Sequence, residues 1–363
     1  MDNVTIVGGG FSAFLAKLML GNRALIIKGP LPANYKNFQL KRHSTLEVNK
    51  FFGGKAYSAT KLKPLFNNLR LHDRLVNGGN SKIWGGMIDT SKVPKKIIQA
   101  LNEYGVTLQQ LSFDKTGSIS NNPNLAQLLN SSGKVLDVGE YFQMNESSFL
   151  ESFFIEEGRI GLKVISCKNN QPKIIYTKHL ILCTGVVQTI DLLYRSGYLK
   201  EEDKINLSEF GHQRSLTLTL SPGLIKKDEN ATTVRFDMAR AFCHFLGIQK
   251  RLWLSDISRY TPIFVDQKFT NSKSKYHLKI INGYLLELQD NLCGAERIKH
   301  AHGRSIHYCN LKINEININQ YLKEISNKLS GIGMAFVDQN APGPISGDIA
   351  LDAYNKIKLL LRD

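Results

Sequence analysis

Glycine residues at a fixed spacing, close to the start of the 363-residue chain, are the first candidates for chemistry. The stretch NVTIVGGGFSAFLAKLML (3–20) contains the pattern Gly8-x-Gly10-x-x-Ala13. Glycine lets main-chain amides approach a pyrophosphate, and a small third residue lets a helix lie close to a strand. The pattern predicts dinucleotide binding, and the residues expected to line the phosphates are Gly8, Gly10, Phe11, Ser12 and Ala13.

The elements that position these residues must be a strand, a turn and a helix. Residues 4–7 are mostly apolar and all β-branched, and 11–20 have the apolar spacing of a helix. A second strand is expected at 24–27, as a βαβ unit requires. Lys28 follows it, where an acid usually holds the ribose hydroxyls. We therefore expect Lys28 to donate to the ribose or to meet extra negative charge, unless the site is degenerate.

A second glycine turn lies in KHLILCTGVVQTIDLLYRSGYL (178–199). The pattern predicts a strand at 180–182, a turn through Thr184 and Gly185, and a helix from about 189 to 195. The preceding residues, 140–176, alternate strand-like runs with turns. This order resembles the FAD half of flavoproteins that bind two dinucleotides. Gly185 would then pass close to the cofactor, where a side chain would collide.

The stretch NGGNSKIWGGM (77–87) has four glycines and a tryptophan within eleven residues. Such a loop can lie flat against a planar ligand, because glycine removes the side chains that would hold it away. The residues expected to face the cofactor are Gly79, Asn80, Ser81, Trp84, Gly85, Gly86 and Met87.

With these three motifs in order, the chain resembles the glucose–methanol–choline (GMC) family of flavin oxidoreductases, nearest to its sugar-oxidising, pyranose oxidase-like branch. The resemblance implies FAD, bound non-covalently because Ile83 stands where some members carry a flavin-linking histidine. It implies an α/β fold: a Rossmann-type FAD-binding domain (1–210 plus 295–363) with an inserted, reduced α+β substrate domain (211–294). The implied reaction oxidises a CH–OH group of a sugar, sugar derivative or other alcohol by hydride transfer to flavin N5.

That reaction needs a base with a pKa near neutrality, which favours histidine. The segment KHAHGRSIHYCN contains His300, His302 and His307. The family pattern and the flanking Ile306 and Tyr308 favour His307 as the base, with His300 as the second candidate.

The end of the chain completes the resemblance. GMAFVDQNAPGPISGDIALDAYNKIKLLL predicts a strand at 334–337 and a closing helix from about residue 349. The family implies that Asp338 approaches the flavin. Asp348 is the only ionisable residue near the second catalytic position, where the family has His or Asn, and its alternative role is a helix N-cap. Because that His or Asn is missing, a degenerate, non-catalytic flavin-fold binding protein is an alternative. Lys28 favours a second one, an NADP-dependent oxidoreductase.

Composition sets the remaining expectations. There are 47 Lys and Arg against 31 acids, and the net charge of +16 would attract nucleic acid, an anionic membrane surface or an acidic small molecule. We find no nucleic-acid motif and no apolar run of the ~20 residues that span a bilayer. The five cysteines form no CxxC pair, so we expect no metal site and a cytoplasmic protein. The expected partner is a small-molecule substrate such as a sugar or anionic sugar derivative.

Overall fold

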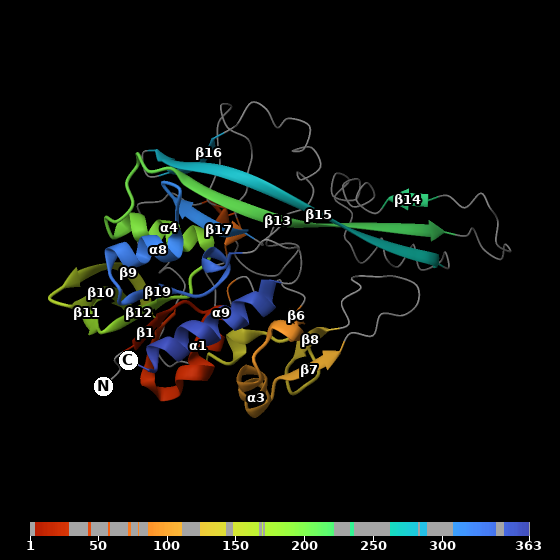
Figure 1. The fold of residues 1–363 in the computed structure, drawn as a ribbon, viewed down its shortest axis with the longest axis horizontal. Coiled ribbons are helices and arrows are strands. Elements are labelled where there is room, and N and C mark those ends of the chain that lie inside the picture. The colour runs from red at the N-terminus through yellow and green to blue at the C-terminus, as the bar shows by residue number, and fades with distance from the viewer. Residues whose placement is uncertain are drawn as a thin grey trace.

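The computed structural model shows a parallel sheet with helices on both faces and several antiparallel sheets around it (Figure 1). The model describes fully the residues 4–28, 86–110, 124–142, 148–166, 171–208, 277–280, 309–338 and 346–362. Outside these ranges it describes Gly79, Asn169 and the backbone of further strand and helix residues.

Four short strands form the parallel sheet in the order β19-β12-β1-β2. They are β1 (Val4–Val7), β2 (Ala24–Ile27), β12 (His179–Leu182) and β19 (Leu329–Gly331). Every neighbouring pair is parallel. Helix α1 (Phe11–Leu20) joins β1 to β2, as the sequence predicted. The α/β class is therefore confirmed.

Each face of this sheet has its own core, because successive strand residues point to opposite sides. Ile6 packs with α1 and with the long helix α9 (Ile345–Leu360). Val7 packs instead with α4 (Val186–Arg195). Helices α1 and α4 therefore cover opposite faces of the sheet.

Two three-stranded antiparallel sheets flank this centre. The first is a meander of order β11-β10-β9, which confirms the strand-like pattern of 140–176; its strands are β9 (Ser148–Glu156), β10 (Arg159–Ser166) and β11 (Pro172–Thr177). The second has the order β6-β8-β7 and lies beside helix α3; these elements are β6 (Met87–Asp89), α3 (Lys95–Glu103), β7 (Thr107–Gln110) and β8 (Leu125–Leu129).

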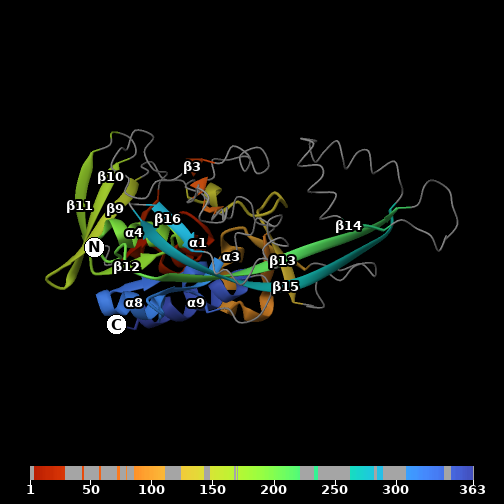
Figure 2. The same cartoon turned by 90° about the horizontal axis from the view of Figure 1, so that it is seen from above.

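The largest sheet has the order β16-β15-β13-β17-β18, with β14 also paired to β13. Figures 1 and 2 both show β13 and β15 as a long ribbon extending away from the parallel sheet. The strands are β13 (Ile205–Leu220), β14 (Thr233–Arg235), β15 (Pro262–Ile281), β16 (Tyr284–Leu288), β17 (Tyr308–Ile313) and β18 (Ile316–Asn317). The domain boundaries placed after residues 210 and 294 stay a prediction.

Shorter elements complete the described chain. They are η1 (Gly21–Arg23), β3 (His43–Ser44), β4 (Tyr57–Ser58), β5 (His72–Asp73), η3 (Thr90–Lys92), η4 (Val138–Glu140) and α8 (Ile318–Ile325).

One predicted element is wrong. The segment expected to be a strand at 334–337 is a 3₁₀ turn, η5 (Met334–Phe336), and the strand β19 lies just before it. Gly333 has a φ of +133°, which ends the extended chain. The ring of Phe336 then folds over Gly331, where a Cβ atom would collide with it. Helices α4 and α9 also begin three or four residues earlier than predicted.

Arg195, in a buried ion pair within α4, joins this helix to the meander. Arg195 contacts Asp191 at 3.1 Å, with side chains only 5% and 1% exposed. Arg195 also donates to the carbonyl oxygen of Leu150 at 3.2 Å and lies over the ring of Phe149. Removing one partner from such a pair leaves an uncompensated buried charge.

We therefore expect Arg195→Met to lower the free energy of unfolding by about 3–5 kcal/mol. The double variant Asp191→Leu/Arg195→Met should recover much of this loss, because it removes both charges. Lys200→Ala, which removes the surface partner of Glu202 at 3.9 Å, should cost less than about 1 kcal/mol. Urea unfolding followed by circular dichroism measures all three, and equal losses for Arg195→Met and Lys200→Ala would contradict the assignment.

Candidate dinucleotide site

The glycine turns after β1 and β12 lie next to each other at the carboxyl edge of the parallel sheet. Cys183 N donates to the carbonyl oxygen of Val7 at 2.7 Å, and Gly8 N donates to that of Ile27 at 3.0 Å. The turn after β1 is therefore held from both sides by its neighbouring strands.

Gly8 has a structural reason to be glycine. Its φ is +136°, a backbone conformation that residues with side chains rarely adopt. A Cβ atom at this position would also collide with the main-chain carbonyl of Cys183. The atom that excludes a side chain is the carbonyl oxygen of Cys183, directly after β12. The predicted contact of Gly8 with a pyrophosphate stays a prediction.

Helices α1 and α4 both begin at this edge with uncapped N-termini. Their N-cap residues are Gly10 and Gly185, and no side chain among the described residues caps either one. Neither helix has an acid in its first turn. Free N–H groups and the positive end of the helix dipole make such a terminus an anion site.

The two helices leave neighbouring strands toward opposite faces of the sheet. Helix α1 follows β1 and packs in one core, whereas α4 follows β12 and packs in the other. In open parallel sheets, ligands bind in the crevice where adjacent connections diverge in this way. The edge between β1 and β12 is therefore the expected ligand crevice.

Gly185 and Thr184 occupy the beginning of α4. The hydroxyl groups of Thr184 and Thr189 lie 2.8 Å apart, and Thr189 Oγ1 donates to the carbonyl oxygen of Gly185 at 3.0 Å. Thr189 N donates to the same oxygen at 2.8 Å. The threonines thus fix the shape of the turn.

A third turn joins the site from β19, and sequence analysis missed it. Ile332 N donates to the carbonyl oxygen of Leu182 at 2.9 Å. A Cβ atom at Gly333 would lie 2.8 Å from Ser12 Oγ, so Gly333 sits against the first turn of α1. The glycine spacing in SGIGM (330–334) is the signal that could have identified this turn.

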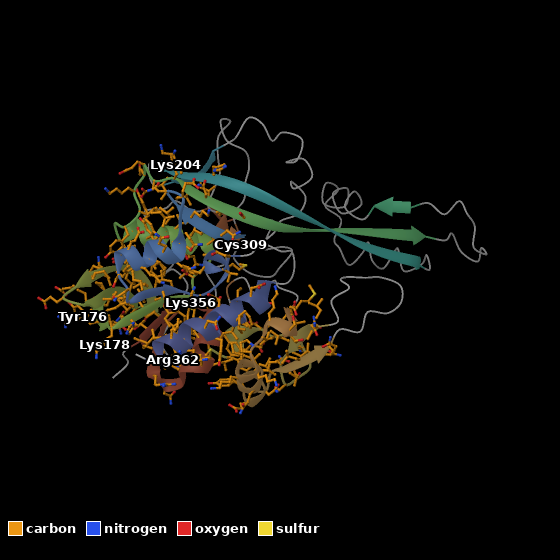
Figure 3. The ribbon with its side chains drawn as sticks, viewed as in Figure 1. Tyr176, Lys178, Lys204, Cys309, Lys356 and Arg362 are labelled. Atoms are coloured by element: carbon orange, nitrogen blue, oxygen red, sulfur yellow. The ribbon has the colours of Figure 1, made fainter. Side chains whose placement is uncertain are left out.

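Lys356 fastens the end of β19 to α9, and it too was missed (Figure 3). Its ammonium donates to the carbonyl oxygen of Gly331 at 2.6 Å and to Asn319 Oδ1 of α8 at 2.8 Å. It also pairs with Asp352 at 3.0 Å. Burial lowers the pKa of Lys356 and, on the neighbouring strand end, raises the pKa of the Cys183 thiol.

Lys28 lies inside the protein at the end of β2. The residue is 4% exposed, and Nζ donates to the carbonyl oxygen of Phe142. The ammonium also lies 5.1 Å from the centre of the Phe142 ring. Burial lowers the pKa of Lys28. Its predicted role at the ribose stays a prediction.

The glycine-rich loop at 77–87 is described only in part. Gly79 and Gly86 have φ values of +52° and +66°. A Cβ atom at Gly86 would lie 2.8 Å from Val135 Cγ1, and the carbonyl oxygen of Met87 accepts a hydrogen bond from Ser346 Oγ of α9. Packing therefore accounts for Gly86. The other predicted contacts of this loop lie outside the described residues: Asn80, Ser81, Trp84 and Gly85.

The predicted catalytic residues are not brought together within the described part of the chain. His300 and His307 lie outside it. Asp348, in the first turn of α9, is held by Lys92, whose Nζ lies 2.9 Å from both carboxylate oxygens. The catalytic roles of these residues stay predictions.

Asp338 is exposed and is held in place by β18, at the end of the large sheet. Its Oδ1 accepts a hydrogen bond from Asn317 Nδ2 at 2.7 Å. Asn310, three residues after His307, has a φ of +53° at a bulge in β17, and its N–H donates to the carbonyl oxygen of Val337 at 3.4 Å. The segment after His307 therefore lies beside the residue that precedes Asp338.

Among the described residues, no cluster of three His, Cys, Asp or Glu side chains could hold a metal ion. No helix in this part of the chain combines the length and apolar character needed to cross a membrane.

Comparisons with known proteins place few constraints on this site. No family model matches the chain, and no curated protein matches it. Among solved structures, it is similar to the substrate-free rebeccamycin biosynthetic enzyme RebC, at 10% identity and a TM-score of 0.37 over 99% of this chain and 63% of that chain. RebC with reduced flavin gives 9% identity, the same TM-score and 62% of that chain. The p-nitrophenol 4-monooxygenase PnpA from Pseudomonas putida gives 11% identity, a TM-score of 0.37 and 79% of that chain. The chain thus spans less than two thirds of the length of RebC.

These comparisons correct the resemblance to the GMC family, which is wrong. No GMC or other family model matches, and the similar structures are a rebeccamycin biosynthetic enzyme and a nitrophenol monooxygenase. The strand at 334–337 that seemed to complete the family pattern is the turn η5. A glycine turn after a β-branched strand is shared by many dinucleotide-binding folds and does not identify one family.

The close approach of Gly8 to the Cys183 carbonyl can be tested by adding a Cβ atom at this position. Gly8→Ala should lower the free energy of unfolding by more than ~2 kcal/mol, because strain at positive φ adds to the overlap with Cys183. Gly133→Ala is the matched control, with φ +72° and no heavy atom within 4 Å, and should cost about 1–2 kcal/mol. Urea unfolding measures both, and a Gly8→Ala protein as stable as Gly133→Ala would contradict the described packing.

Proposed function

We propose that this protein is a flavin-dependent oxidoreductase that holds FAD non-covalently in a Rossmann-type site at the carboxyl edge of β1 and β12. The observation that carries the proposal is the pair of uncapped helix N-termini, at Gly10 and Gly185, on adjacent strands whose helices diverge to opposite faces. This arrangement suits the pyrophosphate of a dinucleotide.

The described residues fit such a cofactor. Main-chain amides of residues 8–13 would hold the pyrophosphate, and Ala13, fully buried, lets α1 lie close to the sheet. The turn at Thr184 and Gly185 would line the other side of the crevice. A bound flavin supplies an acceptor for two electrons from an organic substrate.

The chain's own residues provide shape and electrostatics. Both helix termini present positive partial charge, and Lys28 adds a cation behind the end of β2. Lys356 and Gly333 hold the turn after β19 against α1, so that the first turn of α1 keeps its position. This preorganisation lowers the cost of ordering the site when the cofactor binds.

We propose only that the substrate is a small organic molecule. Oxidation of a sugar CH–OH group with a histidine base was implied by the corrected resemblance alone. The alternative of an NADP-dependent enzyme was based on Lys28 as a partner for extra negative charge on the cofactor. In the structure the Lys28 ammonium donates to the carbonyl oxygen of Phe142. A flavin-binding protein without turnover is the remaining alternative, and kinetics on flavin-loaded protein would identify it.

Ser12, in the first turn of α1, allows a test in which one substitution should preserve or raise the stability of the apo protein but weaken FAD binding. An acid at this position stabilises an unoccupied helix N-terminus by about 0.3–1 kcal/mol, but it repels a pyrophosphate. We expect apo Ser12→Asp to be at least as stable as Ser12→Asn, and to bind FAD at least about tenfold more weakly. Asparagine is the matched control, because it has the same size without the charge.

The measurements are urea unfolding of the apo proteins and titration of FAD followed by its visible absorption and fluorescence. Wild-type protein that takes up NADP but not FAD would overturn the cofactor assignment. Equal FAD affinity for the Asp and Asn variants would mean that the N-terminus of α1 does not bind the pyrophosphate of FAD.

A further inference from the structure

The last turn of α9 and the two residues after it carry exposed leucines among cations. Leu359 is 60% exposed and Leu361 is 42% exposed, and Lys358 and Arg362 beside them are exposed as well. Leu351, eight residues before Leu359 in α9, is 40% exposed. Neither core accounts for these side chains.

Further cations lie at the amino edge of the parallel sheet. Arg23 directly precedes β2, and Lys178 directly precedes β12. Both are exposed, and parallel pairing brings the starts of these strands to one edge. This edge is opposite the glycine turns, because a parallel sheet has all its carboxyl ends together.

The end of α9 belongs to the same end of the molecule. Figures 1 and 2 both show α9 finishing near the meander of β9, β10 and β11, away from α3 and the β13–β15 ribbon. Figure 3 labels Lys178 and Arg362 in this region. Asp352, the acid nearest in sequence before these cations, is already paired with Lys356, and Asp363, directly after Arg362, lies outside the described residues.

We propose that this surface, defined by Arg23, Lys178, Lys358, Leu359, Leu361 and Arg362, binds the face of an anionic lipid bilayer. Leucines would enter the boundary between headgroups and acyl chains, and the cations would meet acidic headgroups. The net charge of +16 supplies attraction of the same sign over a longer range.

The chemistry of this surface favours a bilayer over an acidic protein. Protein interfaces are enriched in aromatic side chains at their centre, whereas these six residues are leucines and long cations. Tyr176, 42% exposed and two residues before Lys178, is of a type that also lies at the level of lipid headgroups. Long basic side chains can follow fluid headgroups while their stems cover apolar surface. Since the glycine turns lie at the opposite edge, the dinucleotide crevice would stay open on a bound protein.

The test is sedimentation of the purified full-length protein with vesicles. Phosphatidylcholine vesicles with about one-third phosphatidylserine should bind the protein, pure phosphatidylcholine should bind it weakly, and added salt should weaken both. Lys358→Glu/Arg362→Glu should lower the affinity by at least about 25-fold, since each neutralised cation contributes about fivefold. Leu359→Ser/Leu361→Ser should lower it by at least about tenfold.

Lys95→Glu/Lys96→Glu on α3 is the matched control, because both lysines are exposed and the charge change is identical. It should retain most of the binding to vesicles. An equal loss in this control would mean that net charge alone is responsible, and would overturn the proposal. So would a wild-type protein that ignores anionic vesicles, or one that binds polyglutamate but not lipid.

Discussion

The contact between the turns after β1 and β12 is the constraint on which the site depends. Gly8 leaves room for the Cys183 carbonyl, and hydrogen bonds to Val7 and Ile27 hold the turn between two strands. Because no side chain intervenes, α1 and α4 begin at neighbouring positions of one edge. Their uncapped N-termini then lie at one edge, which is where a parallel α/β sheet is expected to bind a ligand.

Polar groups behind this edge keep the helices in place. Arg195, paired with Asp191 of the same helix, joins α4 to the meander through the Leu150 carbonyl, and Lys356 joins α9 to the end of β19. Burying such groups costs free energy unless each finds partners, and both cations do so with main-chain carbonyls. The same arrangement leaves the outer side of α9 uncovered, so its exposed leucines belong to a different surface from the crevice.

Local patterns predicted the elements that carry the site. The strand at 4–7, the helix at 11–20 and the strand at 24–27 follow from β-branched runs, glycine positions and helical spacing. The same rules misassigned 334–337, because apolar residues fit a strand or a turn equally well. There the ring of Phe336 packs over Gly331, and this contact favours a turn over a strand.

The sequence by itself determined the α/β class, the two glycine turns and the helices that follow them, because these depend on neighbours along the chain. Only the tertiary structure decided which strands pair, that α1 and α4 lie on opposite faces, and that Gly333 lies against Ser12 while Lys356 holds the end of β19. Motif spacing also could not identify a family, since many folds share this turn. The physical reason is that contacts between residues far apart in the chain depend on sheet order and packing, which no local window of sequence contains.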